Sequence, residues 1–357
     1  MVRRRIALIA GSLFFACILS LLFASGAPLR AAAPDRLSDQ EFWKLSADSS
    51  EPDGTFRSEN LLSNELGMQW VIPGLVATAT QGRVYLGVGP EQNFAYIAAL
   101  KPSMAFIIDI RRGNLELQLM YKALFELSVD RAEFVSRLFS KKRPDGLTAS
   151  STALDIFTAY ERVQTSEQLY TDNLQAIEDL LTKKHGLPMS EKDLGGLEWV
   201  YRQFYWFGPS LTYNSAGGGF GGGYSPTYAD LQVATDGPRG VEHGFLSTEE
   251  RFSVLKDLES RNLIVPVVGN FGGPKAIRAV GQYIKARQTT VSAFYLSNVE
   301  QYLNQDSIWN NFICSVATLP LDETSTFIRS TRNAPGPGGS LNPELGNMAM
   351  EVKRCRQ

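Results

Sequence analysis

Val84-Tyr-Leu-Gly-Val-Gly-Pro-Glu-Gln-Asn93 and Met104-Ala-Phe-Ile-Ile-Asp-Ile110 are the two stretches from which the architecture of this chain follows. An apolar strand pattern ends in a glycine turn, a helical pattern follows, and a second apolar strand ends in a carboxylate. This order predicts half of a Rossmann-type nucleoside site. Gly87 and Gly89 would let the backbone approach a ligand, and Asp109 follows where an acid accepts hydrogen bonds from ribose hydroxyls.

The start of the helix after the glycine turn indicates which ligand suits this site. That helix would begin at Pro90-Glu91, and Glu91 suits a positive helix terminus that holds no anion. An acid there would repel a pyrophosphate, so the site favours a ligand without phosphate. S-adenosylmethionine fits, because it offers a ribose to Asp109 and carries cationic groups that Glu91 tolerates. The alternative is a plain glycine turn, since Gly-x-Gly is common and a third glycine is missing.

Strand and helix patterns alternate again in the second half of the chain. Residues 263–268 form an apolar strand pattern that ends near Asn270, and residues 290–296 form another that ends at Ser297. This alternation predicts an α/β fold with a mostly parallel, Rossmann-like sheet and helices on both faces. Ligands bind at the carboxyl edge of such sheets. The predicted cofactor residues are Gly87, Gly89, Glu91, Asn93, Asp109, Asn270 and Ser297.

A helical insertion interrupts this α/β domain, which should span residues 35–330. The insertion covers about residues 141–245, and its apolar spacing predicts helices over residues 153–163, 166–185 and 190–207. The glycine-rich residues 217–224 follow. They are either a lid over a pocket or a surface loop.

Two last strands and a tail are expected at the C-terminal end. Residues 312–317 and 324–328 have strand patterns and would form an antiparallel pair at the edge of the sheet. Residues 331–357 are rich in proline and glycine, which predicts a disordered tail. Cys314 and Cys355 could pair in an oxidising compartment, although their spacing leaves this open.

Residues 1–34 should be a signal peptide or a membrane anchor. Three arginines precede residues 6–29, which carry no charge. Ala31-Ala32-Ala33 offers small residues for cleavage, whereas the length of the apolar run approaches that of a bilayer span. If the leader is uncleaved, residues 6–29 would hold the protein in the inner membrane. In both cases the body is expected outside the cytosol, periplasmic or secreted.

Composition argues against several classes of function. The net charge of −2 becomes more negative without the basic leader, which argues against a nucleic-acid partner. The sequence holds no Cys/His cluster or paired-histidine helix, so no metal site is predicted. With two histidines and no Gly-x-Ser-x-Gly elbow, hydrolase chemistry has little support. A small-molecule ligand is the expected partner.

Methyl transfer requires an in-line approach of nucleophile and methyl group and, for weak nucleophiles, a base. Tyr295, Asn298 and Glu300 lie near the expected mouth and are the candidate residues for orienting an acceptor, with a core position as the alternative for Tyr295. Three polar residues before the first strand could cross the same mouth, or serve as ordinary caps and solvated positions: Asn60, Asn64 and Glu65.

Five stretches carry a resemblance to a known family: Tyr85-Leu-Gly-Val-Gly-Pro-Glu-Gln-Asn93, Asp109-Ile-Arg-Arg112, Asn262-Leu-Ile-Val-Pro266, Phe294-Tyr-Leu-Ser-Asn-Val-Glu300 and Thr318-Leu-Pro-Leu-Asp322. Over residues 37–330 the chain resembles a family of bacterial proteins of unknown function, whose core looks like a class I S-adenosylmethionine-dependent methyltransferase fold. Only residues 84–126 resemble methyltransferase motifs. The resemblance implies that Gly87 and Gly89 belong to the cofactor loop and that Asp109 is the ribose acid.

The departures from that pattern leave two functions open. Proline and glutamate replace the end of the usual glycine-rich loop, and no Asp/Asn-Pro-Pro-Tyr/Phe motif follows a strand, so amino-methylating chemistry has no support. The first function is an S-adenosylmethionine-binding, methyltransferase-like protein of unknown acceptor. Because an exported domain would meet no cytosolic pool of that cofactor, the second is an exported or anchored binding or scaffold protein without catalysis.

Overall fold

The computed structural model of the protein describes residues 34–217, 225–237, 239–331 and 342–355. The predicted leader up to residue 33 and the glycine-rich residues 218–224 lie outside this part. No helix within the described ranges combines the length and the apolar character that a membrane crossing requires.

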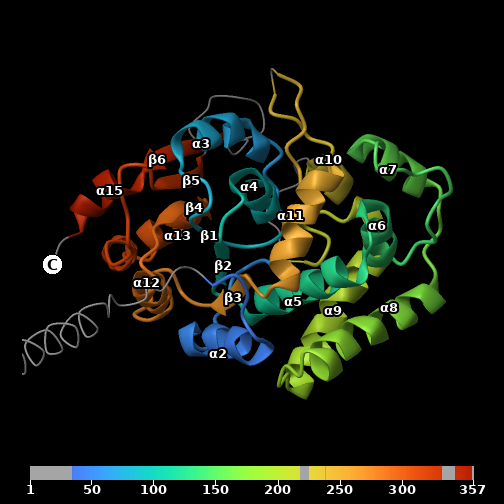
Figure 1. The fold of residues 1–357 in the computed structure, drawn as a ribbon, viewed down its shortest axis with the longest axis horizontal. Coiled ribbons are helices and arrows are strands. Elements are labelled where there is room, and N and C mark those ends of the chain that lie inside the picture. Colours follow the sequence, from blue (N-terminus) through green and yellow to red (C-terminus); the bar gives the residue numbers. More distant parts are fainter. Residues whose placement is uncertain (1–33, 218–224, 238, 332–341, 356–357) are drawn as a thin grey trace, which may run out of the picture. The chain divides into compact units, whose positions relative to one another are not determined.

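Within the described residues, six strands form one sheet in the order β3-β2-β1-β4-β5-β6 (Figure 1). Strands β1 to β5 run parallel to their neighbours, and β6 is antiparallel to β5. The strands are β1 (Val84–Gly87), β2 (Met104–Asp109), β3 (Ile264–Val268), β4 (Val291–Ser297), β5 (Thr326–Thr331) and β6 (Asn342–Asn347). The predicted fold class, a mostly parallel Rossmann-like sheet with an antiparallel edge, is confirmed.

Helices cover the sheet on both faces. Helix α5 packs on β2 and β3, and α11 packs on α5 and α4. Helix α12 packs on β2 and contacts α2 and α14. The bounds outside the insertion are α2 (Asp39–Ser49), α3 (Ile72–Thr78), α4 (Gln92–Leu100), α5 (Arg112–Leu127), α6 (Arg131–Phe139), α11 (Glu249–Ser260), α12 (Ala276–Ala286), α13 (Val299–Gln305), α14 (Trp309–Val316) and α15 (Met348–Glu351), with 3-10 turns at Met68–Val71 and Val352–Arg354.

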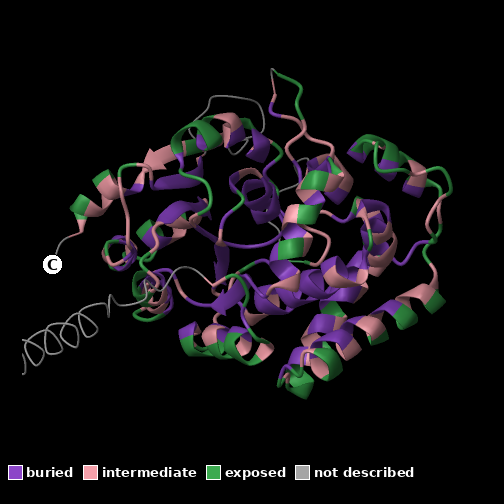
Figure 2. Ribbon diagram, in the orientation of Figure 1, coloured by how far each residue is buried: buried purple, intermediate pink, exposed green. Residues whose placement is uncertain are grey.

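The core lies between these helix layers and the sheet (Figure 2). Every residue of β1, β2 and β3 is buried, which explains why their sequences read as continuous apolar runs. Strand β6 is only half-buried, as expected for an edge strand that contains Pro343.

The insertion is helical, as predicted. It contains α7 (Ala153–Glu161), α8 (Glu167–Asp179), a π turn at Leu180–Lys184, α9 (Glu191–Phe207), a 3-10 turn at Gly208–Ser210 and α10 (Tyr228–Gln232). Capping boxes at Thr152 and Ser190 fix the starts of α7 and α9. Helix α9 packs on α5 and α6, so the insertion extends the core instead of forming a separate body.

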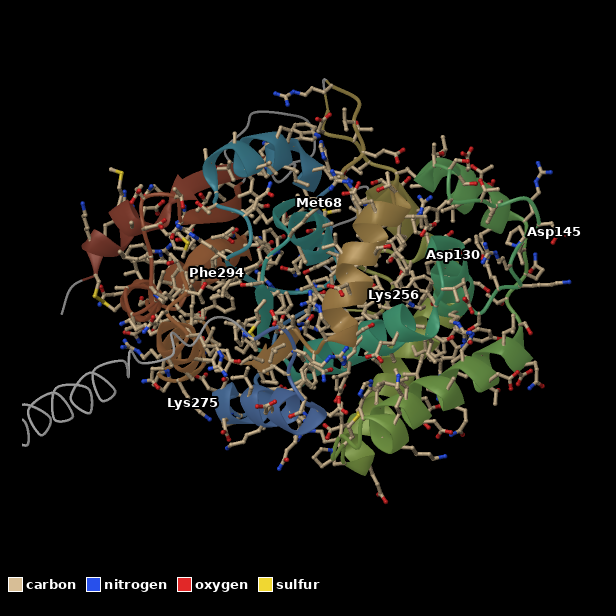
Figure 3. All side chains as sticks on the ribbon, viewed as in Figure 1. Met68, Asp130, Asp145, Lys256, Lys275 and Phe294 are labelled. Atoms are coloured by element: carbon tan, nitrogen blue, oxygen red, sulfur yellow. A yellow bond between two sulfur atoms is a disulfide. The ribbon has the colours of Figure 1, made fainter. Side chains whose placement is uncertain are left out.

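Polar side chains also fix the ends of the helices that join the core to the insertion (Figure 3). The Asp130 side chain accepts a hydrogen bond from Glu133 N at the start of α6. Lys256 on α11 donates to the carbonyl oxygen of Phe125 in the last turn of α5, at 3.1 Å. A cation at that position satisfies orphan carbonyl groups and complements the helix dipole.

The prediction of a strand over residues 312–317 is wrong, because these residues belong to α14. A short apolar run is ambiguous by periodicity, and the buried positions Phe312, Ile313, Ser315 and Val316 follow helical spacing. The antiparallel partner of β5 is therefore β6, which lies in the segment predicted to be a disordered tail.

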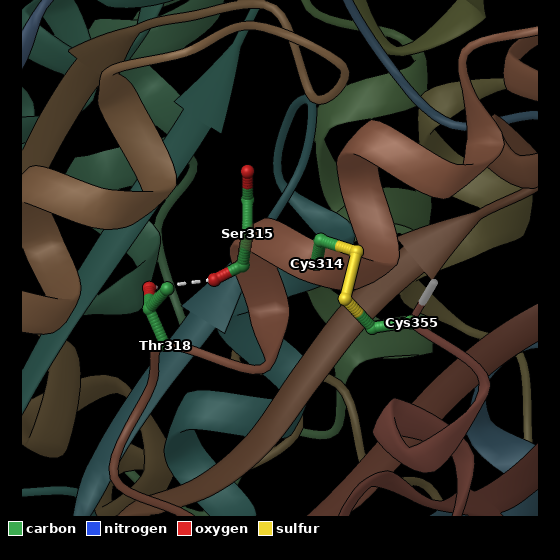
Figure 4. The surroundings of a disulfide bond; sticks show 4 residues. All are labelled: Cys314, Ser315, Thr318 and Cys355. Atoms are coloured by element: carbon green, nitrogen blue, oxygen red, sulfur yellow. Dashed lines mark hydrogen bonds between the residues drawn. A yellow bond between two sulfur atoms is a disulfide. The ribbon is translucent and has the colours of Figure 1, made fainter. Parts of the chain in front are cut away.

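That tail prediction is also wrong for the described residues 342–355. They form β6 and α15, and a disulfide joins Cys355 to Cys314 on α14 (Figure 4). Thr318 Oγ1 donates to Ser315 O at 2.7 Å and closes the end of α14 beside this bond. Composition suggested disorder, whereas pairing with β5 and the covalent link hold the segment against the sheet edge.

Candidate functional site

A cavity of about 720 Å³ lies over the carboxyl ends of the parallel strands. Small-molecule sites are typically about 300–1,000 Å³. Strand β1 stands between β2 and β4, so the cavity lies where the strand order reverses and where open α/β sheets bind ligands. Its lining from the strand ends and the β1–α4 turn includes Gly89, Asp109, Asn270, Ser297 and Asn298. The structure thus brings four of the predicted cofactor residues, Gly89, Asp109, Asn270 and Ser297, to one cavity.

The segment of residues 50–65, which we call the strap, crosses the strand ends and forms one wall of this cavity. Its Glu51 N donates to Val268 O at the end of β3, at 2.8 Å, and its Gly54 N donates to Ile110 O just after β2, at 2.9 Å. The predicted mouth residues lie on the strap and line the cavity: Asn60, Asn64 and Glu65.

Glu51 anchors the strap to the loop that carries Asn270. Its carboxylate accepts hydrogen bonds from the backbone N–H groups of Asn270 at 3.0 Å and of Ala276 at 2.9 Å, at the start of α12. A carboxylate there also complements the helix dipole. The Asn270 side chain closes its own turn, because its Oδ1 accepts from Gly272 N at 2.9 Å. Asn270 therefore shapes this loop and also lines the cavity.

Gly87 and Asn93 build the glycine turn and do not line the cavity. The fully buried Asn93 donates through Nδ2 to Val88 O at 2.9 Å and to Pro90 O at 2.7 Å, and its Oδ1 accepts from Tyr85 at 2.9 Å. A Cβ on Gly87 would lie 1.8 Å from Asn93 Oδ1. Their predicted role as ligand contacts is corrected, because Gly87 is glycine to admit Asn93.

Glu91 is buried behind the turn and does not line the cavity either. Its Oε1 accepts from Ser63 N of the strap at 3.3 Å, and α4 starts one residue later, at Gln92. Desolvation by burial raises the pKa of Glu91 to about 8, so the carboxyl is mostly neutral at pH 7. The expectation that a charged Glu91 faces the ligand and repels phosphate is therefore wrong, because sequence alone does not reveal this burial.

Replacing Glu91 by glutamine is expected to change the pH dependence of stability. Because the pKa is raised in the folded protein, the stability linked to the neutral carboxyl is complete below pH 4.5 and is lost as the pH rises toward about 8. Glu91→Gln should raise the free energy of unfolding by roughly 1–3 kcal/mol at pH 8.5 and hardly change it at pH 4.5. Urea unfolding at both pH values measures this, with the exposed Glu323→Gln as control. An equal effect at both pH values would contradict the assignment.

Asp109 and Arg111 form a buried ion pair on the cavity wall. Asp109 Oδ1 accepts from Arg111 N at 2.9 Å and lies 3.3 Å from Arg111 Nε. Arg111 Nη1 donates to Glu59 O of the strap, whereas Nη2 has no partner among the described residues. The second oxygen of Asp109 also lacks a protein donor in the described part of the chain. The ion pair thus leaves an acceptor oxygen of Asp109 and a donor of Arg111 without protein partners among the described residues, which suits a hydroxyl-bearing ligand.

Glu65 lies at the other end of the cavity, over β4 and β5. Its two carboxyl oxygens accept from the hydroxyls of Ser297 and Ser330. Ser297 has a φ of 51°, a left-handed conformation that is uncommon for a residue other than glycine. Burial raises the pKa of Glu65, and hydrogen bonds from Ser297, Ser330 and Tyr295 offset part of that rise. The strap thus ends in a buried acid held by two strand ends.

The structure separates the three catalytic candidates. Asn298 lines the cavity. Tyr295 is fully buried, and its hydroxyl accepts a hydrogen bond from Gln92 Nε2 at 3.2 Å. It therefore occupies a core position, which was the alternative prediction for this residue. Glu300 pairs with Arg329 and accepts from Trp309 Nε1 at 3.2 Å, beside a second hollow lined by the C-terminal segment. Glu300 is therefore withdrawn as an acceptor-orienting residue, because the first turn of α13 directs it away from the cavity.

Sequence reasoning missed an aromatic and basic part of the cavity wall. The rings of Phe56 and Tyr302 meet edge to face with centroids 5.1 Å apart, and the Arg57 guanidinium lies 4.5 Å from the Tyr302 centroid. Tyr213, from the insertion, also lines the cavity. Among the basic residues that line the cavity, only Arg111 could have been predicted from the sequence, because it follows Asp109 by two positions. The described residues hold no group of three His, Cys, Asp or Glu that could bind a metal ion.

Strand order, crevice and covering helices define a Rossmann-like α/β protein with a small-molecule-sized cavity at its switch point. The chain belongs to the family described as Domain of unknown function (DUF7790), whose model matches residues 61–193 and 229–342. These two segments include β1 to β5 and cover more than half of the chain. The description of this family assigns it no function, and no methyltransferase family matches the chain. No curated protein matches the chain.

Proposed function

We propose that the cavity binds an adenosine-type ligand, S-adenosylmethionine being the one whose chemistry fits best, in a methyltransferase-like protein of unknown acceptor. One observation carries the proposal: Gly89 of the glycine turn and Asp109 of the second strand line the same cavity at the switch point. A ribose there would donate a hydroxyl to the open oxygen of Asp109 and accept from Arg111 Nη2.

The aromatic wall supports the choice of a nucleoside. Phe56, Tyr213 and Tyr302 offer ring surfaces on the same cavity as Asp109. Base–aromatic stacking contributes about 1–3 kcal/mol and tolerates different bases. Gly89 has a φ of 77°, the left-handed conformation that glycine adopts without steric cost, and it lines the cavity without adding a side chain to it. The cavity thereby offers a surface for a base, a polar pair for a sugar and room beyond it.

The second candidate function is an exported or membrane-anchored binding or scaffold protein without catalysis. It is favoured by the catalytic candidates themselves, since Asn298 lines the cavity whereas Tyr295 is buried and Glu300 is engaged elsewhere. We propose an extracytoplasmic location for either function. The uncharged residues 6–29 after the arginines and the Cys314–Cys355 disulfide support it, because disulfides persist in oxidising compartments.

Replacing Asp109 by asparagine should weaken the binding of S-adenosylhomocysteine by about 10- to 100-fold, because a charged acceptor for ribose is lost. Asparagine keeps an Oδ1 that can accept from Arg111 N, so the turn after β2 is retained. Titration calorimetry on residues 35–357 measures the dissociation constant. Asp306→Asn, an exposed acid on the rim of the same cavity, is the matched control and should change it less than twofold.

Two outcomes would contradict the proposal. A folded wild-type protein that binds neither S-adenosylmethionine nor S-adenosylhomocysteine at millimolar concentration would favour the second candidate function. Equal affinity of wild type and Asp109→Asn would place the ligand away from the predicted ribose acid.

A further inference from the structure

The end of the cavity opposite Asp109 has acceptor groups and no cation to match them. Glu65 is buried, and no lysine or arginine among the described residues is a partner of its carboxyl group. Glu91 lies close enough for the two acids to interact, and it has no cationic partner in the described part either. Buried charges are normally paired, so an unpaired acid on a cavity wall calls for a counter-ion or for a proton.

A second side chain points to the same chemistry. Gln92 is 4% exposed and lines the cavity. Its Nε2 donates to the Tyr295 hydroxyl, while its Oε1 has no donor among the described residues. Tyr295 in turn lies close enough to Glu65 for the two groups to interact. An unsatisfied buried acceptor costs free energy comparable to a lost hydrogen bond, so the cavity presents an acid and an open amide oxygen to a group that donates.

An ammonium group meets both requirements. It carries three N–H donors and a positive charge, and its hydrogen bonds to a carboxylate are about twice as strong as neutral ones. We propose that Glu65 and Gln92 bind a primary ammonium group of the ligand, so that the ligand is a nucleoside with an aminoalkyl chain on its 5′ side. This inference rests on the proposed function, because it takes the ribose to lie at Asp109.

The spacing of the strands agrees with such a ligand. Asp109 ends β2, whereas Glu65 is held by Ser297 at the end of β4 and by Ser330 in β5. With neighbouring strands about 4.8 Å apart, the two acids are separated by roughly 10–15 Å across the end of β1. A hydrogen bond of about 2.8 Å at each end leaves a gap that a ribose with a short thioalkylamine chain bridges. Gly89 follows β1, the strand between β2 and β4, and it lines the same cavity without a side chain.

Contact with an ammonium group should change the protonation of Glu65. The titratable groups that interact with Glu65 are Glu91, Tyr96 and Tyr295, none of them a cation. Burial raises the pKa of Glu65 and so favours the protonated form of its carboxyl when no ligand is bound. An ammonium group favours the carboxylate. Binding therefore releases a proton from Glu65 to solvent, while the ligand keeps its own charge.

The test compares two nucleosides that differ only by the amine. 5′-(3-Aminopropylthio)-5′-deoxyadenosine carries the ammonium, and 5′-propylthio-5′-deoxyadenosine has the same chain without it. Calorimetry at pH 7, in two buffers of different ionisation enthalpy, gives both affinity and proton release. For the wild type we expect the amine to bind at least about tenfold more tightly and with net proton release.

Glu65→Gln should reduce this affinity ratio to about one and abolish the proton release, because a neutral amide cannot exchange the proton. Glutamine keeps an oxygen for one of the serine hydroxyls, and circular dichroism checks the fold. Asp306→Asn, on the cavity rim, should keep both the ratio and the proton release.

Equal binding of the two nucleosides by the wild type would overturn the inference and leave the proposed function standing. A tenfold preference that survives in folded Glu65→Gln would overturn it as well. The wild-type comparison decides the question even where the variant does not fold. If neither nucleoside binds, the proposed function fails, and this inference fails with it.

Discussion

A Gly87→Ala variant is expected to lose about 3–5 kcal/mol of unfolding free energy, because the added methyl group collides with the side chain that holds the glycine turn. The new Cβ would lie 1.8 Å from Asn93 Oδ1 and 2.9 Å from the Tyr85 hydroxyl. Asn93 is fully buried and ties together three carbonyl groups of the turn, those of Val88, Gly89 and Pro90. It cannot move without breaking these hydrogen bonds.

Urea unfolding of residues 35–357 measures the loss, and Gly195→Ala provides the control. Gly195 is exposed in the interior of α9, and a Cβ there meets no atom within 4 Å. Alanine at this position should stabilise the protein by up to about 1 kcal/mol, because alanine is the better helix former. If Gly87→Ala were as stable as the wild type, the packing of Asn93 against the turn would be incorrect.

Removing the disulfide should cost about 4 kcal/mol. Cys314 and Cys355 are 41 residues apart in sequence, and in the chain-entropy model a cross-link over a loop of that length disfavours the unfolded chain by about this much. Cys355→Ser therefore lowers the midpoint of urea unfolding. The end of the chain that forms β6 and α15 should become the first part to exchange amide protons.

Reduction of the wild type provides the control for that experiment. Dithiothreitol should lower the stability of the wild type to that of Cys355→Ser, and it should leave Cys355→Ser itself unchanged. A wild-type protein that is equally stable with and without reductant would contradict the predicted contribution of the bond.

The parts of the fold that sequence predicted are those set by local pattern and by one topological rule. The apolar runs of β1 to β4 are buried on both faces, and the serine and threonine caps of the insertion helices act within a few residues. The carboxyl ends of parallel strands lie at one edge of the sheet. From this rule alone, the sequence predicted that Asp109 and Ser297 line a common cavity.

The predictions that failed concern features that depend on contacts between distant segments. Residues 312–317 are too short and apolar for periodicity to distinguish strand from helix, and the pairing of β6 with β5 overrides a composition that suggested disorder. Likewise, the burial of Glu91 and the packing of Asn93 against Gly87 arise only when the strap and α4 meet the sheet. A residue type at the right place in a motif therefore did not reveal whether it faces the ligand.

The strap explains why the candidate site could be only half predicted. The strand ends supply Asp109, Asn270 and Ser297, but the wall opposite them comes from a segment with no regular secondary structure. Its position is set by single long-range contacts, such as Glu51 to the start of α12 and Glu65 to Ser297. No local pattern encodes such contacts.

The most direct test of the account is a crystal structure of residues 35–357 with S-adenosylhomocysteine bound. We predict that a ribose hydroxyl lies within about 3.2 Å of the Asp109 carboxylate. We also predict that the thioether chain passes Gly89 toward Glu65. A ligand bound elsewhere on the protein, or one in this cavity whose ribose does not contact Asp109, would contradict it.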